Sequence, residues 1–189
     1  MLNQWKPKRV IEVGSGFSSL LTAHVNHNML NNSIDFTCIE PYPREFLKKK
    51  IPGLNNVIVE KVQNLDKSIF TALEAGDILF IDSSHVAKTG SDVNSLFFEI
   101  LPILKKGVRI HLHDIFLPFE YDKIWVLEEN RSWNEQYLLR ALLMYSDTFK
   151  VLFGCNYAQY KYPELVSKAM ALKKQQGFGG VSIWIEKAK

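Results

Sequence analysis

Short apolar runs rich in Val, Ile and Phe recur along this chain of 189 residues, and longer segments with helical spacing separate them. This alternation is typical of an α/β protein with a Rossmann-like, doubly wound sheet that is mostly parallel and has helices on both faces. It predicts seven strands, at residues 9–14, 35–40, 56–61, 77–82, 108–114, 149–155 and 180–186. Helices are expected at residues 17–30, 43–50, 66–74, 91–106, 134–146 and 162–174.

The length and composition predict one domain that spans residues 1–189. Hydrophobic residues make up 47% of the chain, which suffices for one buried core, and the chain is rather short for two. The net charge of +3 comes from scattered lysines with small clusters at 48–50 and 173–174. Because a nucleic-acid footprint needs basic residues gathered on one face, we do not expect a nucleic-acid partner.

The sequence also predicts a cytoplasmic protein without a membrane partner. No apolar run approaches the ~20 residues of a membrane span, and the first residues lack the apolar core of a signal peptide. Cys38 and Cys155 both fall in apolar stretches that are expected to be strands, where small buried thiols are common. The sequence is compatible with a monomer and with a homo-oligomer.

The turn after the first expected strand is rich in glycine. Gly14 and Gly16 permit a tight turn and close approach of the backbone to a ligand. A dinucleotide site requires a third glycine where Ser19 stands, and the acidic Glu12 suits a ligand with a cationic amino-acid tail. These details favour S-adenosylmethionine (SAM) over NAD, with Glu12, Gly14, Ser15 and Gly16 as binding residues. An ordinary tight turn is the alternative.

Two further strand ends carry candidate cofactor residues. Glu40 closes the second expected strand, where a carboxylate can accept hydrogen bonds from both hydroxyls of a ribose. Gln63 and Asn64 follow the third strand and are placed to meet an adenine edge. The alternatives are a solvent-exposed strand-end glutamate and a plain polar turn.

The ends of the fourth and fifth expected strands carry acidic and histidine residues. In the usual doubly wound order these strands are neighbours ~4.8 Å apart, so Asp82 and Asp114 can converge on one ion or substrate. His85 follows Asp82 by three residues and can take a proton from an acceptor hydroxyl, because imidazole titrates near neutral pH. A loop-capping aspartate and a surface histidine are the alternatives.

The connection at residues 115–133 is long and aromatic, as functional loops often are. It predicts either a wall for a sugar or another ring-bearing acceptor, or packing that closes the top of the fold. His111, within the fifth strand, is expected to be buried and hydrogen-bonded to a neighbour.

The glycine-rich turn after Glu12, the glutamate at position 40, the strand at 77–82 and the seven-strand pattern resemble the class I SAM-dependent methyltransferases over almost the whole chain. A narrower resemblance lies in the segments 82–85, 113–121 and 133–136. It is to a bacterial branch that includes sugar O-methyltransferases of antibiotic tailoring and cephalosporin-tailoring enzymes.

This narrower resemblance implies roles for single residues. The positions of Asp82, His113 and Asp114 would hold a magnesium ion, and His85 would be the base. The relatives carry two acids where this chain has His113 and Asp114, and imidazole is a poor ligand for a hard cation.

Three functions follow as hypotheses. The first is a SAM-dependent methyltransferase that methylates an oxygen of a small molecule or sugar, with His85 and Asp82 as catalytic residues. The second is a catalytically inactive SAM-binding or interaction protein of the same fold. The third is a nucleotide-sugar or NAD-binding oxidoreductase.

Overall fold

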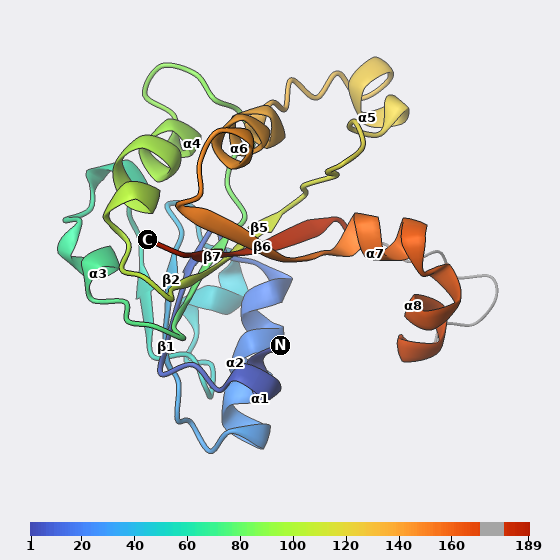
Figure 1. Cartoon of the computed structure of the whole chain (residues 1–189). Helices are drawn as coiled ribbons and strands as arrows, with labels where there is room; N and C mark the ends of the chain where they lie inside the picture. Colours follow the sequence, from blue (N-terminus) through green and yellow to red (C-terminus); the bar gives the residue numbers. More distant parts are fainter. Residues whose placement is uncertain (171–179) are drawn as a thin grey trace.

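The computed structural model describes residues 1–170 and 180–189. Seven strands form one sheet in the order β3-β2-β1-β4-β5-β7-β6 (Figure 1). Their bounds are β1 (Arg9–Val13), β2 (Asp35–Ile39), β3 (Asn56–Ile58), β4 (Ile78–Ile81), β5 (Arg109–His113), β6 (Phe149–Gly154) and β7 (Ser182–Lys187). The first five strands pair in parallel, and β7 runs antiparallel to both β5 and β6. The predicted mostly parallel sheet is confirmed.

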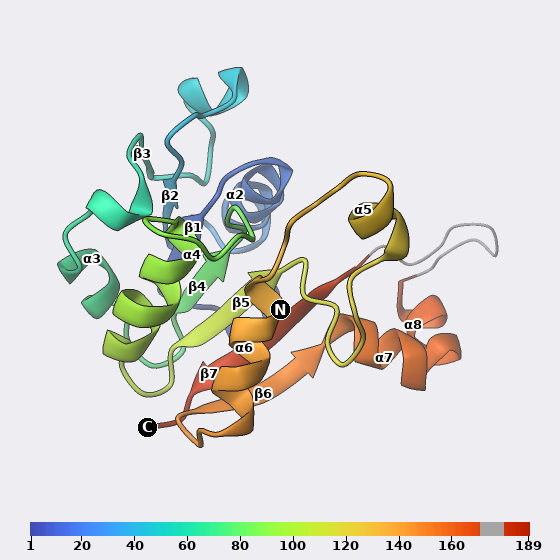
Figure 2. The same cartoon turned by 90° about the horizontal axis from the view of Figure 1, so that it is seen from above.

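Helices cover both faces of the sheet, as predicted. Helices α1 and α2 lie on one face, and α3, α4 and α6 lie on the other (Figures 1 and 2). The bounds are α1 (Leu2–Trp5), α2 (Phe17–Met29), α3 (Ser68–Thr71), α4 (Asp92–Ser95), α5 (Lys123–Leu127), α6 (Glu135–Met144), α7 (Cys155–Lys161) and α8 (Pro163–Ala169). Both views show α5 and α8 away from the sheet, whereas α7 continues directly from the end of β6.

The core lies in two layers because side chains alternate along each strand. Val10 and Phe36 belong to the layer beneath α2, whereas Ile11, Leu79 and Leu112 belong to the larger layer on the other face. Strands buried on both faces have nearly continuous apolar sequences, which is why these strands could be predicted.

Several predicted helices are shorter or divided. The segment expected as one helix at 91–106 is α4 followed by a π-helical turn (Leu96–Ile100) and a 3-10 turn (Leu101–Ile103). Pro102 lacks a backbone N–H, so a regular α-helix cannot continue through it. The helix expected at 43–50 is a 3-10 helix (Glu45–Lys48).

The carboxyl-terminal third differs most from the prediction. Cys155 begins α7 instead of lying in a buried strand, so that prediction is wrong, whereas Cys38 is buried in β2 as expected. α8 occupies the first part of the helix expected at 162–174. Its predicted end and the lysine cluster at 173–174 lie outside the described residues.

Within residues 1–170 and 180–189, no helix has the length and hydrophobicity needed to cross a bilayer. The cytoplasmic location stays a prediction.

Candidate functional site

A cavity of about 580 Å³ opens beyond the carboxyl ends of β1, β2 and β4. In the sheet, β2 lies on one side of β1 and β4 lies on the other, so the strand order reverses at β1. Ligands of sheets of this type bind at such a reversal. Four of the predicted site residues line this cavity together: Gly14, Glu40, Gln63 and Asp82. The structure therefore places candidate cofactor residues and a candidate catalytic residue around one cavity.

Glu40 ties the glycine-rich turn to the second strand. Its Oε2 accepts a hydrogen bond from the Ser15 backbone N–H at 3.1 Å, and its Oε1 accepts one from the Tyr42 N–H at 2.9 Å. A carboxylate has about four acceptor positions, so the side chain can accept further donors from the cavity. The hydroxyl oxygen of Ser15 is buried and has no hydrogen-bond partner among the described residues.

Glu12 and Asn64 are not among the residues that line the cavity. Glu12 is only 1% exposed, and its Oε1 accepts a hydrogen bond from the Ser18 hydroxyl at 2.5 Å. Burial raises the pKa of Glu12 to about 7. Asn64 is exposed and donates to Glu60 at 2.8 Å. Glu12 thus shapes the turn from beneath, and Asn64 is engaged outside the cavity.

Gly16 sits at the start of α2. Its N–H donates to the Ser19 hydroxyl at 3.0 Å, and a β-carbon added to Gly16 would meet no atom within 4 Å. The space beside Gly16 is therefore open to a ligand.

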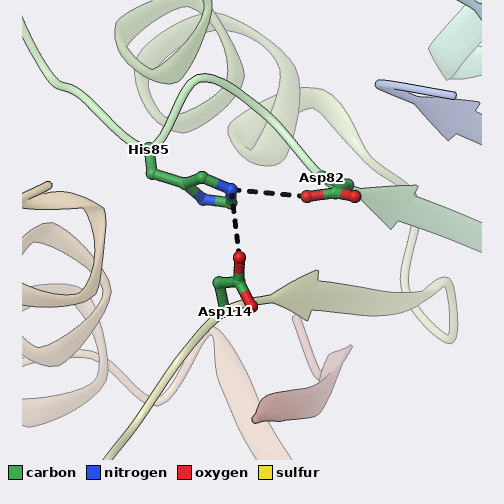
Figure 3. Close-up of side chains that lie close together, drawn as sticks. All are labelled: Asp82, His85 and Asp114. Atoms are coloured by element: carbon green, nitrogen blue, oxygen red, sulfur yellow. Dashed lines mark ion pairs between the residues drawn. The ribbon is translucent and has the colours of Figure 1, made fainter. Parts of the chain in front are cut away.

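A second group of side chains adjoins the cavity at the ends of β4 and β5 (Figure 3). His85 Nε2 lies 3.3 Å from Asp82 Oδ1 and 3.6 Å from Asp114 Oδ2. One potential ligand atom from each of these three residues lies within 4.8 Å of the other two. Because β4 and β5 are neighbours in parallel, as expected, their ends bring the two aspartates together. We call Asp82, His85 and Asp114 the acidic cluster.

Glu135, at the start of α6, supports His85 from behind. Its Oε2 lies 2.8 Å from His85 Nδ1, its Oε1 accepts a hydrogen bond from the Ser83 hydroxyl at 3.1 Å, and its side chain is 1% exposed. Glu135 was given no role in the sequence analysis, although it belongs to the 133–136 segment of the resemblance. Acidic residues are common in the first turn of a helix, so nothing in the sequence singled out Glu135. Only the fold brings Glu135 close to His85.

The charges around His85 determine its protonation. Burial by itself lowers the pKa of His85, but hydrogen bonds to Asp82 and Glu135 and the charge of Asp114 outweigh burial and raise the pKa to about 9. Without another cation the imidazole therefore carries its proton at neutral pH. Burial also raises the pKa of Asp114, while the neighbouring histidines oppose this shift.

His113 does not join the acidic cluster. Its side chain is 41% exposed, and its Nε2 lies 3.5 Å from Asp114 Oδ1, the oxygen that faces away from His85. The structure thus brings His85, and not the expected His113, to the two aspartates.

His111 is buried as expected. Its Nε2 lies 3.5 Å from His113 Nδ1, and its Nδ1 has no partner among the described residues. Burial and the nearby His113 lower the pKa of His111 to about 3, so it is neutral.

The aromatic segment at 115–133 packs against itself and against the acidic cluster. Phe116 meets the Trp125 ring edge-on at 5.1 Å, and the Arg131 guanidinium lies 4.1 Å from Trp125 and 4.6 Å from Trp133. Trp133 in turn lies 4.3 Å from the His85 ring. The segment therefore packs largely against itself and forms one side of the environment of His85.

A family model described as a methyltransferase domain matches residues 11–115, more than half of the chain. An uncharacterized protein of Archaeoglobus fulgidus is 42% identical over 72 residues, which are 37% of this chain and 33% of that protein. The match thus spans about a third of that curated relative.

Solved structures share the fold at low identity. A putative methyltransferase from Thermobifida fusca has a TM-score of 0.54 at 14% identity, covering 100% of this chain and 76% of that one. The 16S rRNA (adenine(1408)-N(1))-methyltransferase from Catenulisporales acidiphilia has a TM-score of 0.48 at 10% identity, covering 100% and 93%.

These neighbours correct one prediction from the sequence. Nucleic acid was not expected as a partner, and that exclusion is wrong, because several similar structures are rRNA methyltransferases. The prediction of a SAM-dependent methyltransferase is confirmed at the level of the family, whereas the sugar and cephalosporin branch stays a prediction. Given the match over residues 11–115 and the sheet order, the chain belongs to the methyltransferase-domain family and has the class I SAM-dependent methyltransferase fold.

Proposed function

We propose that residues 1–189 act as one domain that transfers the methyl group of SAM to a hydroxyl oxygen of a small molecule such as a sugar. The observation that carries this proposal is that Glu40 and Asp82 line the same cavity of about 580 Å³. A cofactor held by Glu40 would therefore lie beside the acidic cluster. A volume of this size is within the range of ordinary ligand pockets.

The cofactor would be held by the turn at residues 14–16 and by Glu40, whose carboxylate would accept the ribose hydroxyls. Gln63 lines the cavity and donates through Nε2 to the Gly90 carbonyl at 3.1 Å, which leaves its carbonyl oxygen for the adenine amino group. Glu12 would act through Ser18, by fixing the turn on which the methionine part rests.

The reaction is an in-line displacement. The acceptor oxygen attacks the methyl carbon, a C–O bond forms as the C–S bond breaks, and the sulfonium becomes the neutral thioether of S-adenosylhomocysteine. The hydroxyl proton passes to the acidic cluster, of which Asp82 lines the cavity and His85 and Asp114 lie behind it. The enzyme contributes mainly alignment and desolvation.

The narrower resemblance also implies a divalent cation, and the donor atoms of the acidic cluster fit one. Carboxylate oxygens and an imidazole nitrogen converge there from three directions. When bound, such a cation supplies positive charge that lowers the cost of exposing the oxygen nucleophile.

A SAM titration by calorimetry and a radiolabelled methyl-transfer screen test the proposal together. The acceptors are sugars, small phenols and an rRNA fragment. Methyl transfer to a hydroxyl compound is expected, and transfer to rRNA alone would overturn the proposed acceptor. SAM binding without transfer would favour the inactive SAM-binding protein, and thermal stabilisation by NAD instead of SAM would favour an oxidoreductase.

The Gly16→Val variant tests the place of the cofactor. A side chain at Gly16 meets only open space in the protein, so this variant should fold normally. Bulk there should lower SAM affinity at least tenfold. Unchanged affinity would place the cofactor elsewhere.

A further inference from the structure

We propose that the acidic cluster binds a divalent transition-metal ion such as Mn²⁺ or Zn²⁺, with His85 Nε2 as a direct ligand beside Asp82 and Asp114. The inference rests on the proposed function for its chemical purpose, and it deepens that function by naming the ion class and the third ligand. It replaces the magnesium site with His113 that the resemblance implied.

The spacing of the three donor atoms suits one ion. Ligand atoms ~2.1 Å from a metal lie roughly 3.0–3.4 Å from one another in octahedral or tetrahedral geometry. His85 Nε2 is 3.3 Å from Asp82 Oδ1 and 3.6 Å from Asp114 Oδ2. The three donor atoms all lie within 4.8 Å of one another, so the two carboxylates would close around the ion when it binds. Figure 3 shows both carboxylates directed at the same ring nitrogen.

Glu135 determines which nitrogen of His85 faces the aspartates. The Nδ1–H donates to the buried Glu135 carboxylate at 2.8 Å, so in the neutral ring Nε2 carries the lone pair. His85 is 5% exposed, and Nε2 faces only carboxylate oxygens, which cannot donate. Either a second ring proton on Nε2 or a metal ion must therefore stand between the ring and the two carboxylates, and a metal ion would occupy the place of that proton. A carboxylate behind a histidine ligand is also the usual outer partner in protein metal sites.

The donor set favours a transition-metal ion over Mg²⁺. Magnesium prefers oxygen ligands and keeps several waters, whereas imidazole suits zinc, iron and their neighbours. Two carboxylates and one imidazole therefore match Mn²⁺ or Zn²⁺ better. Asp82 also lines the cavity, so the remaining coordination positions would face the proposed acceptor.

His113 provides a matched control within the same chain. It also contacts Asp114, at 3.5 Å, but through the other carboxylate oxygen and with a side chain that is 41% exposed. A metal held by the set that the resemblance implied would depend on His113. A metal held by the acidic cluster would depend on His85.

The experiment is calorimetric titration of the EDTA-stripped full chain with MnCl₂, ZnCl₂ and MgCl₂. Loss of the free Mn²⁺ signal in electron paramagnetic resonance gives a second readout. We expect Mg²⁺ to bind at least tenfold more weakly than the other two ions. His85→Ala should weaken Mn²⁺ and Zn²⁺ binding at least a hundredfold, Glu135→Gln should weaken it about 10–100-fold, and His113→Ala should change it less than threefold.

Thermal melting and circular dichroism check that each variant is folded, and His85→Gln replaces His85→Ala if the alanine variant is not. Failure of the wild-type chain to bind 1 mM Mn²⁺ or Zn²⁺ would overturn the inference, as would dependence on His113 instead of His85. Equal affinity for Mg²⁺ would overturn the ion class. SAM titration and methyl transfer in EDTA are measured in parallel, so that loss of the metal site and failure of the proposed function are distinguishable.

Discussion

Gly14 lies so close to Asp82 that a β-carbon on Gly14 would come within 1.7 Å of the Asp82 carbonyl oxygen. The Asp82 N–H also donates to the Val13 carbonyl at 2.8 Å, so the ends of β1 and β4 are bonded at this point. The backbone of Gly14 has a φ of +80°, which side-chain-bearing residues rarely adopt. The first glycine of the turn is therefore required by the fold itself, and it allows the turn at residues 14–16 to lie against the end of β4.

Gly14→Ala is expected to destabilise the protein by ~3 kcal/mol or more, because the added methyl group meets rigid backbone. Gly16→Ala is the matched control, since its β-carbon meets no atom within 4 Å. Urea denaturation measures both free energies of unfolding. Equal stability of the two variants would contradict the assignment.

Gln63→Ala should lower SAM affinity about 5–10-fold, because one neutral hydrogen bond contributes about 1 kcal/mol. Asn64→Ala should leave the affinity unchanged, since Asn64 bonds Glu60 outside the cavity. Calorimetry with SAM and S-adenosylhomocysteine distinguishes the two variants. The reverse order of effects would mean that the adenine lies on the other side of this turn.

The pH dependence of stability should report the buried Glu12. Its pKa is raised from 4.5 to about 7, so its contribution is fully present below pH 4.5 and is lost as the pH rises through 7. Relative to Glu12→Gln, the wild-type free energy of unfolding should fall by up to about 3 kcal/mol over this range. Parallel curves for the two proteins would contradict the raised pKa. The exposed Glu60, whose pKa is lowered by the Lys61 N–H, should give a slope of opposite sign in a Glu60→Gln comparison.

Asn134 should hold the His85 loop to the start of α6. Its Oδ1 accepts from the Ala87 N–H at 2.6 Å, and its own N–H donates to the His85 carbonyl at 2.9 Å. Asn134→Ala should cost ~1–3 kcal/mol and raise hydrogen exchange in residues 83–90. Asn3→Ala, at an exposed position of α1, serves as control. Unchanged exchange in the Asn134 variant would show that other contacts hold the loop.

His85→Ala should lower kcat by about 100-fold or more on an identified acceptor, because Asp82 and Asp114 lose the ring that holds them in place beside the acceptor, and a misplacement of about 1 Å can cost that much. SAM affinity should stay within twofold, because His85 lies behind the cavity and not among the proposed cofactor contacts. Single-turnover kinetics and calorimetry measure the two quantities. Near-normal turnover would leave Asp82 and Asp114 to handle the proton without His85.

The amino-acid pattern alone was enough to predict seven strands, a mostly parallel sheet and the strand ends at which chemistry could lie. Strands that are buried on both faces need continuous apolar runs. In this chain, glycines and polar turns separate these runs, so the local pattern was sufficient to locate the strands. The nearness of Asp82 and Asp114 also followed, because neighbouring parallel strands end at the same edge of the sheet.

Which histidine joins the two aspartates could not be predicted from the sequence, because it depends on contacts between distant segments. His85 follows Asp82 by three residues and His113 directly precedes Asp114, so both lie near an aspartate in sequence, and the choice depends on where the backbone directs each ring. A left-handed backbone at His85, with φ of +59°, and a buried partner fifty positions later turn its imidazole toward both carboxylates. Glu135 is that partner. Contacts between residues so far apart come from packing α6 against the end of β4, and no local pattern encodes such a distance.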